Sequence, residues 1–296
     1  MAASPPVFRF APSPNGRLHL GHALSALANE RLAARFGGRL LLRIEDIDPG
    51  RCRPDYEQGV RDDLAWLGIA FDGAVRRQSE HLDDYRAALE RLAGQGLIYP
   101  CFCSRQEVKA AIAAREGDGR LWPRDPDGAP LYPGTCRTIA PDEAAARIAA
   151  GAPHVLRLAM GRALDAASTM PGGPLGWRNF DDAGGLAAVA ADPARWGDAV
   201  LARREVPTSY HLSVVVDDAL QGVSHVVRGR DLEAATDIHV LLQRLLGLPT
   251  PLYRFHPLLT DEAGRKLAKS RGSRSLAELR AEGATPAAIR ARLGFT

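Results

Sequence analysis

The stretch that decides the fold is Val7–Asp48, which reads VFRFAPSPNGRLHLGHALSALANERLAARFGGRLLLRIEDID. Its start, Val7–Phe10, predicts a short strand that runs into a turn rich in proline and glycine. A helix with leucines three and four residues apart follows and ends at Gly37-Gly38. The next strand, Arg39–Glu45, lacks alternation, which is typical of a parallel strand buried on both faces. Strand, helix and strand form one βαβ unit, which crosses over right-handed.

The rest of the chain continues this α/β pattern around a segment of different character. Residues 99–195 hold three of the four cysteines and many prolines and glycines, and their periodicity is poor. Outside that segment the spacing of apolar residues predicts helices at 55–67, 82–94, 231–246, 276–282 and 286–293, and strands at 210–217, 223–228 and 253–259. We therefore expect a doubly wound parallel sheet of Rossmann type. Its two halves are residues 1–98 and 196–260, with 99–195 as an inserted subdomain and 261–296 as a loop and a short helical tail.

Composition excludes several classes of protein. The chain has 296 residues, of which 46% are hydrophobic and 25% charged, so it is not a disordered chain. No apolar run reaches the roughly 18–20 residues of a membrane span. The first residues do not resemble a secretory signal, and four cysteines do not make a disulfide scaffold. We expect a cytoplasmic monomer that does not associate with membranes.

The basic residues are unevenly distributed. Lys and Arg number 38 against 35 Asp and Glu, a net charge of +3, and lysine occurs at just three positions, 109, 266 and 269. Residues 265–296 carry a local charge of +6, which comes from eight basic and two acidic residues. A basic end on a nearly neutral protein indicates contact with phosphate or nucleic acid, although a solvated basic helix has the same composition.

Two short motifs lie at opposite ends of the α/β pattern. His19 and His22 fall where the first helix begins, at a positive dipole end that favours anions, so they are candidates for binding phosphate. A metal site and a plain helix cap remain alternatives for this pair. Lys266 and Lys269 lie three residues apart after a glycine turn, and their mobile point charges suit a triphosphate. The alternative for them is a solvated basic loop.

Together, HLGH at 19–22 and KLAKS at 266–270 resemble the two signature motifs of class I aminoacyl-tRNA synthetases, HIGH and KMSKS. The surrounding residues 9–16 (RFAPSPNG) and 42–48 (LRIEDID) resemble glutamyl-tRNA synthetases in particular. The second motif departs from the pattern at Leu267 and Ala268. Only 26 residues follow Ser270, whereas ordinary glutamyl-tRNA synthetases continue into an anticodon-binding region. In length and in the cysteine segment the chain resembles the short glutamyl-Q tRNA(Asp) synthetase family.

This resemblance implies a ligase with a defined set of site residues. Glutamate would be bound by Arg9, Phe10, Ala11, Pro12, Ser13, Glu45, Tyr210 and Arg228. His19 and His22 would bind ATP and assist catalysis with Lys266 and Lys269, and Lys269 would also contact ATP. The residue types suit these roles, because arginine pairs with carboxylates and a glutamate side chain can hold an ammonium. Mg²⁺ is expected to accompany ATP.

The cysteines indicate a second site. Cys101, Cys103 and Cys136 cluster in the sequence of what we expect to be a cytosolic protein, which favours zinc over a disulfide, with inert thiols or a redox role as alternatives. The resemblance implies Tyr132 as the fourth ligand of one structural zinc ion per chain.

The function implied by the resemblance is ATP-dependent activation of glutamate, followed by its transfer to the queuosine base in the anticodon of tRNA(Asp). Two alternatives stay open. One is a truncated glutamyl-tRNA synthetase that charges the 3′ end of tRNA(Glu), and the other is a catalytically silent tRNA-binding paralogue.

Overall fold

The computed structural model describes residues 4–116, 121–260 and 274–295. The helices are α1 (Leu20–Arg35), α2 (Pro54–Trp66), α3 (Leu82–Gly94), α4 (Arg105–Glu116), α5 (Pro141–Ala149), α6 (Met160–Thr169), α7 (Tyr210–Leu220), α8 (Ala235–Leu246), α9 (Leu276–Ala281) and α10 (Pro286–Arg292). The strands are β1 (Val7–Phe10), β2 (Arg39–Ile44), β3 (Arg76–Arg77), β4 (Ile98–Cys101), β5 (Val155–Leu158), β6 (Gly176–Phe180), β7 (Leu186–Ala190), β8 (Val200–Ala202), β9 (His225–Gly229) and β10 (Leu252–His256). Short 3₁₀ turns span Gln78–Glu80, Pro193–Trp196 and Arg230–Leu232.

The main sheet is parallel except at one edge, and the order in which its strands follow one another along the chain reverses at its centre. On one side β1 pairs with β2 and β2 with β3, and on the other β9 pairs with β10 and β10 with β6, all in parallel. β7 joins β6 in antiparallel register at the edge. The two sides meet where Ser224 donates its backbone N–H to the carbonyl of Val7 at 3.0 Å and accepts the N–H of Val7 at its Oγ at 2.9 Å. The junction of β1 and β9 is therefore the topological switch point.

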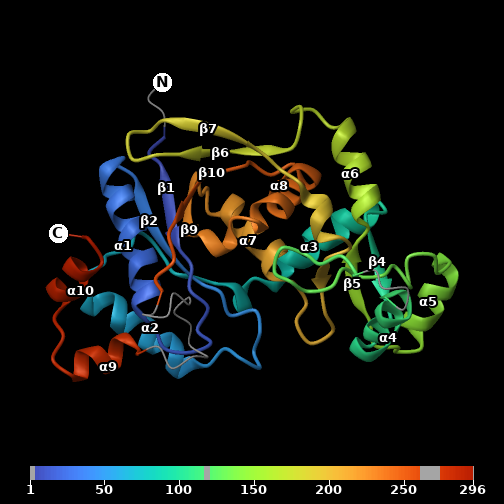
Figure 1. Cartoon of the computed structure of the whole chain (residues 1–296), viewed down its shortest axis with the longest axis horizontal. Coiled ribbons are helices and arrows are strands. Elements are labelled where there is room, and N and C mark those ends of the chain that lie inside the picture. Colours follow the sequence, from blue (N-terminus) through green and yellow to red (C-terminus); the bar gives the residue numbers. More distant parts are fainter. Residues whose placement is uncertain (1–3, 117–120, 261–273, 296) are drawn as a thin grey trace.

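Both faces of this sheet are covered. Val227 of β9 belongs to the apolar cluster that contains α1 residues, whereas its neighbour Val226 packs in the cluster that contains Val240 of α8. β2 is buried along its length apart from Arg39, as its run of leucines predicts. The predicted α/β fold with a parallel sheet is confirmed, and Figure 1 shows α1 and α8 on either side of β1 and β9.

A second, antiparallel sheet is formed by β4, β5 and β8. With α4 and α5 it lies at the end of the molecule away from α1 (Figure 1). The predicted inserted segment, 99–195, contributes to both sheets, because β6 and β7 belong to the main one.

One predicted strand is wrong. Residues 210–217 (YHLSVVVD) were expected to be a strand because of their β-branched run, and they form the first two turns of helix α7. The Ser209 hydroxyl caps this helix by accepting the N–H of Leu212, and Val214–Asp218 are all buried. A helix buried on most of its surface shows no amphipathic period, so a short apolar run in it cannot be distinguished from a strand.

The other predicted elements lie within a few residues of the observed ones, with one subdivision. The helix expected at 231–246 is a 3₁₀ turn, Arg230–Leu232, followed by α8. The described tail, α9 and α10, packs on α1 and α2, where Arg290 forms an ion pair with Glu30 at 2.8 Å. None of the described helices has the length and apolarity needed to cross a membrane.

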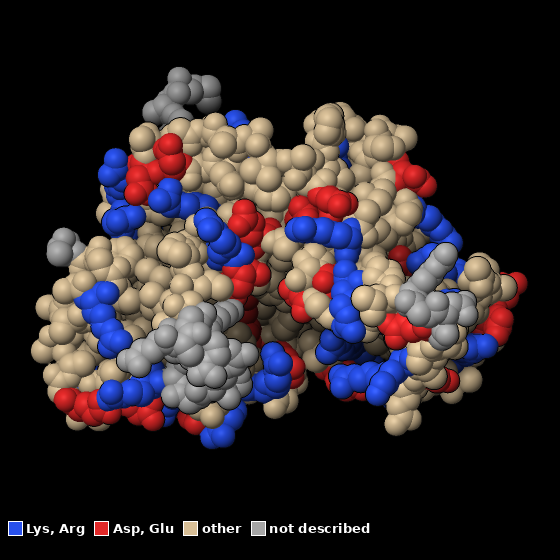
Figure 2. All heavy atoms as spheres, viewed as in Figure 1, with Lys and Arg blue, Asp and Glu red and all other residues tan. Residues whose placement is uncertain are grey.

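The surface seen in Figure 2 is hollowed between two halves of the molecule. Basic and acidic side chains gather together along the rims of this hollow.

Candidate active site

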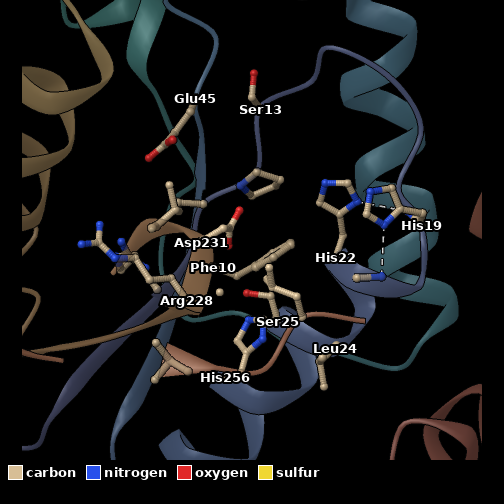
Figure 3. A pocket seen from close by; sticks show the side chains of 18 of the residues that line it. Phe10, Ser13, His19, His22, Leu24, Ser25, Glu45, Arg228, Asp231 and His256 are labelled. Carbon is tan, nitrogen blue, oxygen red and sulfur yellow. Dashed lines mark hydrogen bonds between the residues drawn. The ribbon is translucent and has the colours of Figure 1, made fainter. Parts of the chain in front are cut away.

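A cavity of about 860 Å³ opens at the carboxyl ends of the central strands. Ten of the residues predicted for glutamate and ATP line it: Arg9, Phe10, Ala11, Pro12, Ser13, His19, His22, Glu45, Tyr210 and Arg228. They come from the ends of β1, β2 and β9 and from the beginnings of α1 and α7. Figure 3 shows His19 and His22 on one side of the cavity and Glu45 and Arg228 on the other. This is the crevice in which doubly wound sheets bind ligands.

Arg9 reaches the cavity because the residues of β1 alternate. Phe8 and Phe10 belong to the apolar cluster around α1, so the intervening Arg9 turns toward α7. There its Nε donates to Oδ1 of Asp218 at 3.1 Å. The same carboxylate oxygen accepts from Nη1 of Arg43 at 2.8 Å, and Arg43 is completely buried. Asp218 therefore balances charge for two buried guanidinium groups.

The charges around Asp218 set its protonation. Burial alone would raise its pKa, but the guanidinium groups of Arg9 and Arg43 outweigh that effect and hold the pKa below its ordinary value. The opposite holds for Glu45, where burial is the larger effect and raises the pKa despite Arg43 and Arg9. A cationic group placed beside Glu45 would favour its ionised form.

Arg228 ends β9 and is held by neutral groups. Its Nη1 donates to the Tyr210 hydroxyl at 3.3 Å and lies 3.2 Å from Nδ1 of His239, and its Nη2 donates to Oγ1 of Thr236 at 2.7 Å. Its Nε is buried and has no hydrogen-bond partner among the described residues. The ordered part of Arg228 is therefore its two terminal nitrogens, which donate to Tyr210, Thr236 and His239 at the wall of the cavity.

His19 and His22 form the start of α1. Nδ1 of His19 accepts the N–H of Gly21 at 3.1 Å, and Nδ1 of His22 accepts the N–H of His19 at 3.1 Å (Figure 3). The cap considered among the alternatives is thus present. Because Nδ1 accepts in both rings, the proton of each neutral imidazole is on Nε2, which makes each ring a hydrogen-bond donor. The centroids of the two rings lie 3.9 Å apart at the helix N-terminus.

Lys266 and Lys269 lie outside the described residues. The described residues that precede and follow positions 261–273 lie close to the cavity. Leu258 and Leu259 line it, and beyond the gap Leu276 donates its N–H to the carbonyl of Leu18 at 2.8 Å. Ser275 forms a β-bridge with His19.

The sequence analysis did not identify several residues that line or support the cavity. Asp218, Thr236 and His239 hold the two arginines, and Asp231 and His256 also line the cavity. Asp217-Asp218 directly after a valine run was the available signal, because two acids within a buried segment need partners. Nothing in the spacing distinguishes Thr236 or His239 from other residues of an apolar helix.

The cysteines form a separate cluster. The sulfur atoms of Cys101, Cys103 and Cys136 lie within 4.8 Å of one another, and the Cys103 and Cys136 sulfurs are 3.3 Å apart. The Tyr132 hydroxyl lies 3.5 Å from the Cys103 sulfur and accepts the N–H of Cys136 at 2.8 Å. Three convergent sulfurs are a donor set that suits a metal ion. Burial raises the pKa of the Cys103 thiol to about 11.

Known proteins resemble the chain over nearly its whole length. The family model for tRNA synthetases class I (E and Q), catalytic domain, matches residues 7–296. A glutamyl-Q tRNA(Asp) synthetase of Rhodobacter capsulatus is 51% identical over 293 residues, covering 98% of this chain and 100% of that protein. A glutamyl-Q tRNA(Asp) synthetase of Symbiobacterium thermophilum is 41% identical, and the match covers 97% of this chain and 85% of that protein.

A solved structure supports the same assignment. The crystal structure of a glutamate tRNA ligase from Elizabethkingia meningosepticum, in complex with its amino acid, matches with a TM-score of 0.74 and 26% identity. The match covers 96% of this chain and 59% of that one. The chain therefore belongs to the class I tRNA synthetases of the glutamate and glutamine family, and within that family of ligases to the glutamyl-Q tRNA(Asp) synthetases.

Proposed function

We propose that the chain activates glutamate with ATP and transfers it to the queuosine base in the anticodon of tRNA(Asp). One observation carries the first half of this proposal. Complements for a carboxylate and for an ammonium, Arg228 and Glu45, face the same cavity as the N-terminus of α1. The queuosine target is supported by the names of the relatives that are 51% and 41% identical.

Glutamate fits this cavity in one orientation. Its side-chain carboxylate pairs with Arg228 beside the Tyr210 hydroxyl, with the charge of Arg9 nearby, and its ammonium pairs with Glu45. The α-carboxylate is then left to face His19 and His22 on the opposite side. The remaining wall, Phe10 to Ser13, supplies shape and the Ser13 hydroxyl.

ATP places its phosphates at the start of α1. The first backbone N–H groups of a helix and its dipole attract anions, and the two Nε2–H groups add donors. Lys266 and Lys269 would stabilise the charge that develops on the phosphates. Mg²⁺ bound to ATP would shield the phosphate charge, and it needs few protein ligands because it keeps several waters.

The chemistry needs no covalent bond to the enzyme. An oxygen of the glutamate α-carboxylate attacks the α-phosphorus, the bond to the bridging oxygen breaks, and pyrophosphate leaves. A hydroxyl oxygen of queuosine then attacks the carbonyl carbon of the adenylate, and AMP leaves with the bonding electron pair while the hydroxyl proton is lost. Positioning and charge stabilisation provide the catalysis.

We also propose that Cys101, Cys103, Cys136 and Tyr132 hold one structural zinc ion. The thiols would bind as thiolates, and the positive charge of the zinc ion would offset the cost of burying a negative charge at Cys103. Metal analysis of the purified protein should find one zinc per chain. Cys103→Ser should lose it, whereas Cys52→Ser, a cysteine outside the cluster, should keep it. Full zinc affinity in Tyr132→Phe would exclude the tyrosine as a ligand.

The function is tested by offering labelled glutamate and ATP with purified tRNA(Asp), with and without queuosine, and with tRNA(Glu). We expect label on queuosine-containing tRNA(Asp) alone, and we expect it to survive nuclease trimming of the 3′ end. Label on tRNA(Glu) that trimming removes would instead support a 3′-end charging enzyme. Absence of label on any tRNA, without glutamate-dependent pyrophosphate exchange, would support a silent RNA-binding paralogue.

A further inference from the structure

Two histidines behind the cavity extend the contacts of Arg228. His239 of α8 is buried, and its Nε2 lies 3.2 Å from Nδ1 of His211 on α7. His211 in turn packs edge-on against Trp196, with ring centroids 5.0 Å apart. Arg228, His239 and His211 thus form a continuous chain that leads from the cavity wall into the protein.

The direction of the hydrogen bonds in this chain is fixed by the arginine. A guanidinium can only donate, so Nδ1 of His239, 3.2 Å from Nη1 of Arg228, must accept. The proton of His239 is then on Nε2, from which it is donated to Nδ1 of His211. Both rings are neutral in this arrangement, because a cationic ring would turn an N–H toward another donor.

Burial supports the neutral state. Burial and then the charge of Arg228 lower the pKa of His239 well below its ordinary value, and the same two causes lower the pKa of His211 to about 4. The aromatic rings of Tyr253 and Phe255 lie 5.3 and 5.7 Å from the guanidinium carbon. These neighbours, with Tyr210 and Thr236, are uncharged, and no carboxylate of the described residues forms an ion pair with Arg228.

We propose that the His239–His211 pair determines specificity by positioning Arg228 with neutral acceptors, so that its whole positive charge is available to the substrate's side-chain carboxylate. A carboxylate in place of His239 would orient Arg228 equally well but would also neutralise it. The uncharged amide of glutamine would then compete with glutamate. This inference rests on the proposed function and adds to it two positioning residues, neither of which lines the cavity.

Three substitutions of His239, each by a side chain of similar volume, separate the effect of its charge from the effect of its shape. His239→Gln keeps a neutral acceptor, His239→Glu supplies a charged one, and His239→Leu supplies none. The full chain is assayed by amino-acid-dependent ATP–pyrophosphate exchange, with KM and kcat measured for glutamate, glutamine and ATP. His225→Asn is the matched control, since His225 lies on the same strand as Arg228 and does not line the cavity.

We expect His239→Gln to stay within about threefold of the parent chain in glutamate KM. His239→Leu should raise that KM about ten- to hundredfold, the effect of removing an acceptor from a buried charged donor, with little change in the KM of ATP. His239→Glu should lower the preference for glutamate over glutamine by at least about tenfold. Thermal unfolding of each variant identifies any that do not fold, and direct titration with glutamate provides a second readout.

Equal glutamate KM and equal preference in the Gln, Glu and Leu variants would overturn the inference while leaving the proposed function intact. A parallel loss of kcat and of ATP affinity in all three would also overturn it, since that is the result of a purely structural role. A parent chain that neither binds glutamate nor catalyses exchange with it would overturn the proposed function itself.

Discussion

Arg9 and Arg228 face the same cavity from neighbouring strands, and they are held in opposite ways. Arg9 donates to Asp218, a buried carboxylate that it shares with Arg43. Arg228 is held by hydroxyls and an imidazole. Arg9 therefore shares a counter-charge within the protein, whereas Arg228 forms no ion pair with a carboxylate of the described residues. We therefore expect Arg9 to contribute more to the stability of the cavity than Arg228, and we expect Arg228 to contribute more to the choice of substrate.

The largest effect should come from removing the counter-charge of Arg9. Asp218→Asn leaves Arg9 and Arg43 buried without their shared carboxylate, which should lower the free energy of unfolding by about 3–5 kcal/mol. Urea denaturation measures this change. Asp83→Asn is the control, because its ion pair with Arg86 is exposed and should contribute within about 0.5 kcal/mol. Equal effects of the two substitutions would contradict a special role for Asp218.

A substitution of the second arginine, Arg228, should affect substrate binding more than stability. Arg228→Gln removes the charge that we assign to the substrate carboxylate, so glutamate KM should rise about a hundredfold while ATP KM changes little. Pyrophosphate exchange at varied glutamate and ATP provides both constants, with Arg31→Gln as a surface control. A similar rise in both KM values would show that the whole cavity is disturbed and that the selective role is wrong.

The smallest effect concerns acid stability. Burial, with the charge of Arg228, lowers the pKa of His211 to about 4, against about 6.5 in an unfolded chain. Between these values the unfolded state binds more protons, so stability falls as the pH falls. From pH 7 to pH 5 the loss from this group is about 2 kcal/mol. His211→Phe should show a correspondingly shallower decline in urea denaturation, and an unchanged slope would contradict a buried neutral imidazole.

The sequence predicts some regions of the fold better than others. The β1–α1–β2 unit follows from the pattern because turn residues, apolar spacing and a buried leucine run all indicate the same elements. At Tyr210–Asp217 the β-branched residues favoured a strand, but helix α7 is capped by Ser209 and buried on most of its surface. Tertiary burial outweighed local propensity there.

The same limit applies to the cavity. Residues at the ends of strands, such as Arg9, Glu45 and Arg228, were predicted because parallel strands bring their carboxyl ends together. Most of their supporting groups were not predicted. Thr236 and His239 lie in an apolar helix 8 and 11 residues beyond Arg228, where nothing in the spacing marks them. Asp218 lies 209 residues beyond Arg9, and no periodicity links the two. Sequence reasoning thus found residues that line the cavity and missed those that balance or orient the two arginines.

The most direct test of this account is glutamate-dependent ATP–pyrophosphate exchange by the purified chain without any RNA, with glutamine measured alongside. The cavity brings the proposed partners of glutamate together with His19 and His22, all from this chain, so we predict exchange with glutamate in the absence of tRNA and much weaker exchange with glutamine. Exchange that requires tRNA, or that proceeds equally with glutamine, would contradict the claim that this cavity is a complete, charge-selective site for glutamate activation.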